Sequence, residues 1–323
     1  MMKKIQILIV YVVLGFLVIL GAKNFLHAET LKKYVIDKPH TFSPGTPARS
    51  SEVNENFDVA YEHIQKLINV VCKYHPTETL CQTSDRQETW TNDFGMTFVL
   101  IQPGTFVMGS PEGESGKRHD EVQHSVTLTQ SYYLQTTEVT QGQWKAIMGS
   151  NPSHFSSCGD NCPVDSVTWE AALEFIEKLN LYENANRYKL PTEAQWEYAA
   201  RAGSTTALAN GNLVEIGCGL DTNLDAIGWY CGNSDSKTHP VAQKQANAWG
   251  LFDMHGNIWE WCSDWYGAYP DTSVTDPEGP SSGSGRVGRG GSYGFYAQHS
   301  RSADRYGHGN NNDNVGLRLL RTP

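Results

Sequence analysis

Short strand-like runs separated by glycine and proline turns are the feature that most constrains the fold of this chain. They continue without an internal repeat from about Thr91 to Pro323, and Met96–Ile101 and Gly104–Gly109 are two of them. Apolar runs interrupted this often by turn residues are typical of short strands joined by loops. Because amphipathic helical segments are interspersed among them, the pattern predicts one α+β domain over residues 92–323, with loops on much of its surface.

Two segments of this domain have helical periodicity. The first runs from about Thr140 to Met148 and places Trp144 and Ile147 toward the core. The second begins at Thr168, and its apolar residues recur every three or four positions, which is the spacing of one helix face. The face expected to pack inward consists of Trp169, Ala172, Leu173, Ile176 and Leu179.

A third helix is predicted from its terminal signals. Thr192 is followed three residues later by Gln195, and such a pair forms a capping box that satisfies free backbone N–H groups of the first turn. Gly203 can adopt the left-handed conformation that commonly ends a helix. We therefore expect a helix that begins after Thr192 and ends near Gly203.

The N-terminal segment has the layout of an export signal. Lys3 and Lys4 precede an apolar run, Ile5–Ala22, and the segment ends at the small residue Ala28. The run also reaches the length that spans a bilayer, so residues 1–28 are interpreted as either a cleaved signal peptide or an N-terminal membrane anchor. In both cases we expect an exported chain, at the cell surface or anchored in the inner membrane and facing the periplasm or exterior.

Residues 29–91 are predicted to form a stalk with a helix at about residues 51–72. The apolar residues of this helix alternate at spacings of four and three, the a/d pattern of a coiled coil, which favours a homo-oligomer. So short a coiled coil is marginally stable alone, and packing of the helix on the following domain is the alternative. The a/d positions are Val53, Phe57, Ala60, Ile64, Leu67 and Val71.

Charge excludes one class of partner. Lys and Arg total 25 against 35 Asp and Glu, which gives a formal net charge of -10. Nucleic-acid binding depends on positive charge that releases counterions, so DNA or RNA is not expected as a partner. Between Arg286 and Arg321, six Arg and two Asp give a local balance of +4. These arginines either form a patch for an anionic ligand or pair with carboxylates in the core.

The seven cysteines suit an exported chain. Cys158 and Cys162 bound a tight loop whose ends can approach disulfide distance, whereas a zinc site there would need two further ligands that we do not find. Cys72 and Cys81 could close another small loop. Cys218 and Cys231 are candidates for a further bridge, which would leave Cys262 single. Spacing alone does not decide the connectivity.

Six motifs follow one another in a fixed order. They are Gly104-Thr-Phe-Val-Met-Gly-Ser, Thr137-Glu-Val-Thr, Pro163-Val with Val167-Thr-Trp-Glu-Ala-Ala, Leu190-Pro-Thr-Glu-Ala-Gln-Trp-Glu-Tyr-Ala-Ala-Arg, Gly250-Leu-Phe-Asp-Met-His-Gly-Asn-Ile-Trp-Glu-Trp and Arg289-Gly-Gly-Ser. In residues and order they resemble the formylglycine-generating enzyme (sulfatase-modifying factor) family. The resemblance implies a variant of the C-type lectin fold, a mixed α+β domain with little regular secondary structure. It leaves the activity open, because this fold hosts several functions.

The oxidase of this family carries two cysteines after the motif that matches Arg289-Gly-Gly-Ser, and these cysteines bind copper and activate oxygen. This chain has no cysteine after Cys262. Ser300 and Ser302 cannot replace them, because binding of soft Cu(I) and redox cycling both require thiolate. We therefore expect neither copper nor the catalytic residues of the oxidase.

The iron-dependent sulfoxide synthases resemble the family in one domain and add a histidine-rich iron site in another. The nearest candidates here are His119 and His124, whose spacing does not place two ligands on one helical face. We interpret them as loop residues with structural contacts and expect no iron. His255 falls in a turn inside a family motif, where a structural role is again expected.

A structural calcium site is predicted between Asp253 and Glu260. A carboxylate at each end of a glycine-containing turn offers hard oxygen ligands, and the carbonyls of Gly256 and Ile258 can complete the cage. The resemblance supports this set, because the four positions match those that hold a structural Ca²⁺ in the formylglycine-generating enzyme, with Asp253 where that enzyme has Asn. The alternative is that Asp253 caps the turn and Glu260 pairs with a nearby Arg.

Residues 293–314 have the composition of a binding loop. Tyr supplies contact area with few rotors, while Ser, Gly and Asn adapt their hydrogen bonds. The segment also resembles the variable region of retroelement-diversified proteins with the same lectin-type fold, and an ordinary Gly- and Asn-rich family loop is the alternative. The residues expected to contact a ligand are Tyr293, Gly294, Phe295, Tyr296, His299, Ser300, Asp304, Tyr306, His308, Asn310, Asn311 and Asn312.

Together these features predict an exported or surface-anchored, non-catalytic protein that binds a protein or glycan ligand through residues 293–314. A variable protein of a diversity-generating retroelement is the most specific form of this hypothesis. The alternatives are an oxidoreductase of the formylglycine-generating type or another enzyme of the family, and a structural component of an envelope assembly.

Overall fold

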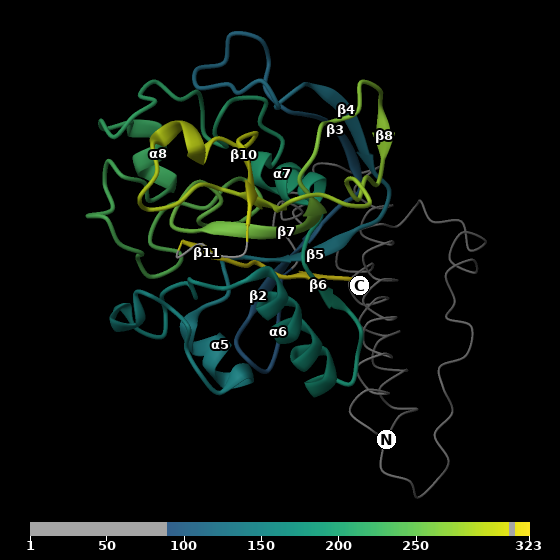
Figure 1. Cartoon of the computed structure of the whole chain (residues 1–323), viewed down its shortest axis with the longest axis vertical. Coiled ribbons are helices and arrows are strands. Elements are labelled where there is room, and N and C mark those ends of the chain that lie inside the picture. The colour runs from purple at the N-terminus through teal and green to yellow at the C-terminus, as the bar shows by residue number, and fades with distance from the viewer. Residues whose placement is uncertain (1–88, 310–313) are drawn as a thin grey trace, which may run out of the picture. The chain divides into compact units, whose positions relative to one another are not determined.

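The computed structural model describes residues 89–309 and 314–323 (Figure 1). These residues belong to one compact unit, Gln87–Pro323. The predicted signal or anchor at residues 1–28 and the predicted helix at 51–72 lie outside the described residues. Within the described part of the chain, no helix combines the length and the apolar character needed to cross a bilayer.

A five-stranded antiparallel sheet brings both ends of the domain together. Its order is β1-β2-β5-β12-β6, so the last strand of the chain is inserted between two earlier ones. Leu320 pairs with Leu134 on one side and with Lys189 on the other. The strand bounds are β1 Thr89–Thr91, β2 Thr97–Ile101, β5 Tyr132–Gln135, β6 Tyr188–Lys189 and β12 Leu320–Arg321.

Two smaller sheets carry the other strands of the described residues. One has the order β10-β9-β7-β11 and the other β3-β4-β8. In the first of them β10 is an edge strand, so one of its sides is not covered by a neighbouring strand of that sheet. The bounds are β3 Gly104–Met108, β4 His124–Leu128, β7 Trp259–Trp265, β8 Val274–Thr275, β9 Arg286–Arg289, β10 Arg305–His308 and β11 Val315–Gly316.

The three predicted helices are present. Thr140 and Thr192 each form a complete capping box, and Thr168 caps the helix between them. The third helix ends at Ala202 and Gly203, which both have positive φ. A fourth helix, α8, was not predicted. The bounds are α5 Gln141–Met148, α6 Trp169–Tyr182, α7 Glu193–Arg201 and α8 Thr222–Ile227, with short 3-10 helices at Ser156–Cys158 and Ala297–Ser300.

The predicted inner face of α6 was wrong at one position. Leu173 is 39% exposed, whereas Phe175 is fully buried and stacks on Trp144 of α5 with 4.9 Å between ring centroids. The two helices lie side by side (Figure 1), and the stripe that faces α5 is centred on Ala172, Phe175, Ile176 and Leu179. Leu173 lies beside this stripe, and its partial exposure is ordinary for a surface leucine.

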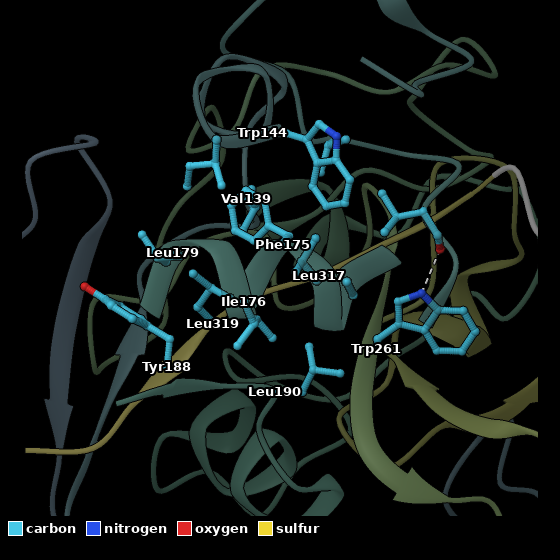
Figure 2. Close-up of a cluster of buried hydrophobic side chains, with 14 of the residues drawn as sticks. Val139, Trp144, Phe175, Ile176, Leu179, Tyr188, Leu190, Trp261, Leu317 and Leu319 are labelled. Carbon is cyan, nitrogen blue, oxygen red and sulfur yellow. Dashed lines mark hydrogen bonds between the residues drawn. The ribbon is translucent and has the colours of Figure 1, made fainter. Parts of the chain in front are cut away.

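One hydrophobic cluster packs α5 and α6 against the C-terminal segment (Figure 2). Trp261 extends from β7 at its margin and donates its indole N–H to the carbonyl of Val167 at 2.8 Å. Trp259 is also fully buried. Buried tryptophans of this kind hold β7 against the helices and so fix the sheet that carries β10.

Both disulfides predicted within the domain are present, whereas Cys72 and Cys81 lie outside the described residues. Cys158 bonds to Cys162, and Cys218 bonds to Cys231. Cys262 is buried and is the one free cysteine among the described residues. Burial raises the pKa of its thiol well above the usual value, which keeps it in the unreactive neutral form.

Candidate ligand-binding site

Arg301, in the predicted binding segment, points into the protein and holds the loop between β3 and β4. Its guanidinium makes a two-point ion pair with Glu121, in which both N–O distances are 2.7 Å. It also donates to Ser110 Oγ at 3.0 Å, to Glu114 at 2.9 Å and to the carbonyl of Gly116 at 2.8 Å. Both Arg301 and Glu121 are fully buried. Charge-assisted bonds of this kind fix the loop relative to the C-terminal segment.

Two further arginines of the C-terminal region are also neutralised inside the domain. Arg305 donates to both oxygens of Glu193, at 2.6 and 2.7 Å, and Arg289 pairs with Glu197. All four side chains are buried. For these residues the local positive balance faces core carboxylates, which is the second of the two interpretations drawn from the sequence.

The exposed part of the segment is aromatic. Tyr296 is 56% exposed and Tyr306 is 40% exposed. Tyr293 and Phe295 are half-buried, and Gly294 is exposed between them. Exposed tyrosines on a backbone fixed by buried charges provide a contact surface that needs little ordering when a ligand binds.

Other predicted contact residues are buried, which corrects the prediction of their exposure. Ser300 and Asp304 are fully buried, and His308 is nearly so, between the rings of Trp259 and Trp261. His299 is half-buried, with its Nδ1 3.3 Å from a carboxylate oxygen of Asp304. Residue types alone could not separate these framework positions from the exposed ones. Asn310, Asn311 and Asn312 lie outside the described residues.

The Cys218–Cys231 disulfide loop supports this segment from behind. The backbone N–H of Cys231 donates to the carbonyl of Phe295 at 3.0 Å, and that of Ala297 donates to the carbonyl of Gly217 at 2.9 Å. The disulfide therefore fixes a loop that shares backbone hydrogen bonds with the residues on both sides of Tyr296.

Two hollows share Arg118, and the smaller one is also lined by Tyr306. The smaller measures about 280 Å³ and is lined by Arg118, Tyr266, Ser284, Gly285, Tyr306 and Gly307. The larger measures about 500 Å³ and is lined by Ser110, Glu112, Gly113, Lys117, Arg118, His119, Val122 and Gln123. Sequence reasoning missed Arg118 and Tyr266, because they are brought to Tyr306 only by the packing of distant segments.

The predicted calcium set fits a cation only in part. Glu260 accepts bonds from Arg318 at 2.8 and 3.0 Å and from the indole N–H of Trp196 at 2.6 Å. Its charge is therefore already matched by a buried guanidinium. This is the arrangement that the alternative interpretation of Glu260 anticipated.

The carboxyl of Asp253 lies beside that of Glu138. One oxygen of Asp253 accepts the N–H of Ala242 at 2.7 Å, and its carboxyl also shares a side-chain hydrogen bond with Glu138. Burial raises the pKa of Asp253 to about 6. Glu138 is buried, and burial together with the charge of Asp253 raises its pKa well above the usual value, so that its protonated carboxyl can donate to Asp253. Asp253 and Glu138, with the carbonyls of Gly256 and Ile258 suggested by the sequence, are the groups that would hold Ca²⁺. Residues 89–309 and 314–323 contain no cluster of three or more Asp, Glu, His or Cys side chains that could hold a metal ion.

The two histidines considered as iron ligands lie in different environments. His119 is exposed, and His124 is buried on β4 against the ring of Tyr269. His255 is buried, accepts the N–H of Ala209 at Nε2 and donates from Nδ1 to the carbonyl of Ser300 at 2.8 Å. Burial lowers the pKa of His255 to about 4, so it is a neutral structural side chain at physiological pH.

This fold and its sequence define a domain class. Residues 83–323 match the sulfatase-modifying factor enzyme 1-like domain, and the chain belongs to this family, with the mixed α+β, C-type lectin-like fold of its members. It is 32% identical over 223 residues to the chaperone protein LppX of Paenibacillus barcinonensis, which covers 54% of this chain and 73% of that protein. It is 37% identical over 140 residues to the formylglycine-generating enzyme of Streptomyces coelicolor, which covers 41% of this chain and 42% of the enzyme.

Solved structures show the same fold. Treponema denticola variable protein 1 superposes with a TM-score of 0.64 at 30% identity, over 74% of this chain and 99% of that one. PvdO from Pseudomonas aeruginosa superposes with a TM-score of 0.62 at 24% identity, over 73% of this chain and 98% of that one. The second likeness concerns the fold alone.

Proposed function

We propose that this chain is an exported, non-catalytic ligand-binding protein whose binding surface is built on residues 293–309. The proposal depends on one observation: some side chains of that segment are buried in ion pairs and others are exposed to solvent. Its arginines are locked onto buried carboxylates, while Tyr296 and Tyr306 project outward on the fixed backbone. Exposed tyrosines on a rigid frame are the usual contact residues of binding loops. The ligand is a protein or a glycan, and the apolar run at residues 5–22 brings the domain to a membrane.

The sequence after Cys262 supports binding over oxidation. No cysteine occurs there, and the four other cysteines of the described residues form disulfides. The copper oxidase of this family uses two cysteine thiolates, which are soft ligands suited to Cu(I). The oxidoreductase alternative draws on the enzymes among the relatives, and oxygen consumption by the copper-loaded chain with a sulfatase-motif peptide would overturn the binding proposal.

The likeness to a variable protein supports a finer proposal, that residues 286–321 are diversified by a retroelement. Such a locus contains a near-identical repeat of the codons for these residues beside a reverse-transcriptase gene. A locus without that repeat would remove the proposal of diversification and leave ligand binding untouched.

The binding surface is tested with the full chain on arrays of glycans and surface proteins. We expect the double variant Tyr296→Ala/Tyr306→Ala to lose its ligand, because truncation of contact tyrosines typically costs more than about 1 kcal/mol each. Tyr182→Ala is the matched control, since Tyr182 is 64% exposed at the end of α6. Equal binding by the double variant and the control would refute the proposed surface.

A further inference from the structure

We propose that the cleft between Tyr306 and Arg118 binds a carboxylated saccharide, with the sugar ring on the tyrosine and the acid group on the guanidinium. This inference rests on the proposed function and names the ligand class of the same surface. It adds a second wall, the β3–β4 loop, to a site that the sequence placed in the C-terminal segment alone.

Arg118 is oriented for an external acid. Its Nε lies 3.6 Å from an oxygen of Asp120, and its guanidinium carbon lies 5.8 Å from the centre of the Tyr306 ring. Its two terminal nitrogens make no hydrogen bond to the described residues. The side chain is 29% exposed and lines both hollows. Two parallel N–H groups of a guanidinium match the geometry of a carboxylate, so these terminal nitrogens are donors ready for one.

Asp120 holds that orientation without filling the cleft. Its other carboxylate oxygen accepts the hydroxyl of Tyr266, and its side chain is only 11% exposed. Lys117 and Glu112, which also line the larger hollow, pair with each other. The single ammonium of Lys117 is thus paired, whereas Arg118 contacts Asp120 through Nε and keeps both terminal nitrogens for a ligand. The acid is therefore assigned to Arg118.

The floor of the smaller hollow is made of glycine. A Cβ on Gly307 would lie 2.9 Å from the ring of Tyr266, and one on Gly285 would lie 2.8 Å from the carbonyl of His308. A larger residue at Gly307 would collide with the ring of Tyr266, and one at Gly285 with the backbone of β10. The smaller hollow is lined by the rings of Tyr266 and Tyr306, the guanidinium of Arg118 and the hydroxyl of Ser284.

This shape and lining favour a saccharide over a protein. Protein partners usually bury about 800 Å² on each side of a broad contact, whereas the smaller hollow of about 280 Å³ admits a group of the size of one ring. The aromatic face of Tyr306 suits the C–H face of a sugar, and apart from Val122 the non-aromatic side chains that line the two hollows are polar or charged.

The experiment compares tetrasaccharides of galacturonic acid and of glucuronic acid with their methyl esters, which have the same rings and no charge. Binding to the full chain is measured by titration calorimetry at low and at physiological salt. We expect at least one free acid to bind about tenfold more tightly than its ester, since charged hydrogen bonds are worth about 1.5–3 kcal/mol. The preference should weaken as salt is added.

Substitutions test which side chain contacts the acid group of the ligand and which contacts its sugar ring. Arg118→Gln should remove the preference for the acid, Arg118→Lys should restore part of it, and Tyr306→Ala should weaken both acid and ester. Tyr182→Ala is the control, because Tyr182 is exposed at the end of α6 and lines neither hollow. Melting curves show whether each variant is folded.

Three results would overturn the inference. They are equal affinity for acid and ester, an acid preference that survives in Arg118→Gln, and failure of both acids to bind. Binding of a protein that depends on Tyr306 and not on Arg118 would overturn the saccharide and keep the proposed function. If the Tyr296→Ala/Tyr306→Ala double variant still binds both the saccharide and the protein ligand, the inference and the proposed function are both refuted.

Discussion

Arg301 and Glu121, which lie 180 residues apart in the chain, form a fully buried two-point ion pair between the C-terminal segment and the β3–β4 loop. The pair joins the two walls of the cleft at Tyr306 and Arg118. Because both charges are removed from water, each depends on the other for its stability.

Glu121→Gln should therefore destabilise the fold strongly. The variant leaves the guanidinium of Arg301 with one fewer buried counter-charge, and breaking a buried pair costs about 3 kcal/mol or more. Denaturant unfolding measures this. Glu174→Gln is the control, because Glu174 forms an exposed pair with Lys178 on α6 and should change stability by less than about 0.5 kcal/mol. Similar small losses in both variants would contradict the structural role of Glu121.

The disulfide between Cys218 and Cys231 should stabilise the binding segment locally. Replacing both cysteines with serine releases the loop whose backbone bonds to Phe295 and Ala297. We expect a stability loss of about 2–4 kcal/mol and faster hydrogen exchange at the amide of Ala297. Removal of the Cys158–Cys162 bridge should leave that amide protected. If hydrogen exchange at the Ala297 amide is unchanged without the Cys218–Cys231 bridge, the bridge does not stabilise the binding segment.

His255 should make stability fall in acid. Its pKa is about 4 in the folded protein and near 6.5 when unfolded, so the unfolded state takes up a proton first as the pH falls. The stabilisation is fully present above pH 6.5 and decreases from there through pH 4, by up to about 3 kcal/mol. Unfolding of wild type and His255→Gln is compared across this range. If the unfolding free energy of the variant falls with pH as steeply as that of wild type, His255 is not the source of the pH dependence.

Calcium should raise the melting temperature if the ligand oxygens of Asp253 and Glu138 hold the ion. An ion present at one hundred times its Kd stabilises the folded state by about 2.7 kcal/mol. Melting is followed in Ca²⁺ and in a chelator, for wild type and for Asp253→Asn. We expect the shift to be smaller in the variant. Equal melting temperatures of wild type with and without chelator would refute the calcium prediction.

The sequence determined the local structure of this domain well. Thr140, Thr168 and Thr192 begin helices because each side chain caps the backbone N–H groups next to it in the chain, an interaction that needs no distant partner. Both disulfides were also predictable, since an exported chain and close spacing suffice to suggest them. The ordered motifs, spread between Gly104 and Ser292, identified the family, and the family model matches residues 83–323.

Tertiary structure decided which residues of the candidate site face solvent. Tyr, His, Asp and Ser look alike as contact residues in a sequence, yet Asp304 and His308 are buried and Tyr296 and Tyr306 are exposed. Charge counting could not tell that Arg301 points inward to Glu121 and that Arg118 lines the cleft, because a charge is satisfied by whatever lies nearest in space. Helix capping depends on residues that are neighbours in the sequence, whereas burial and ion pairing arise only when distant segments pack together.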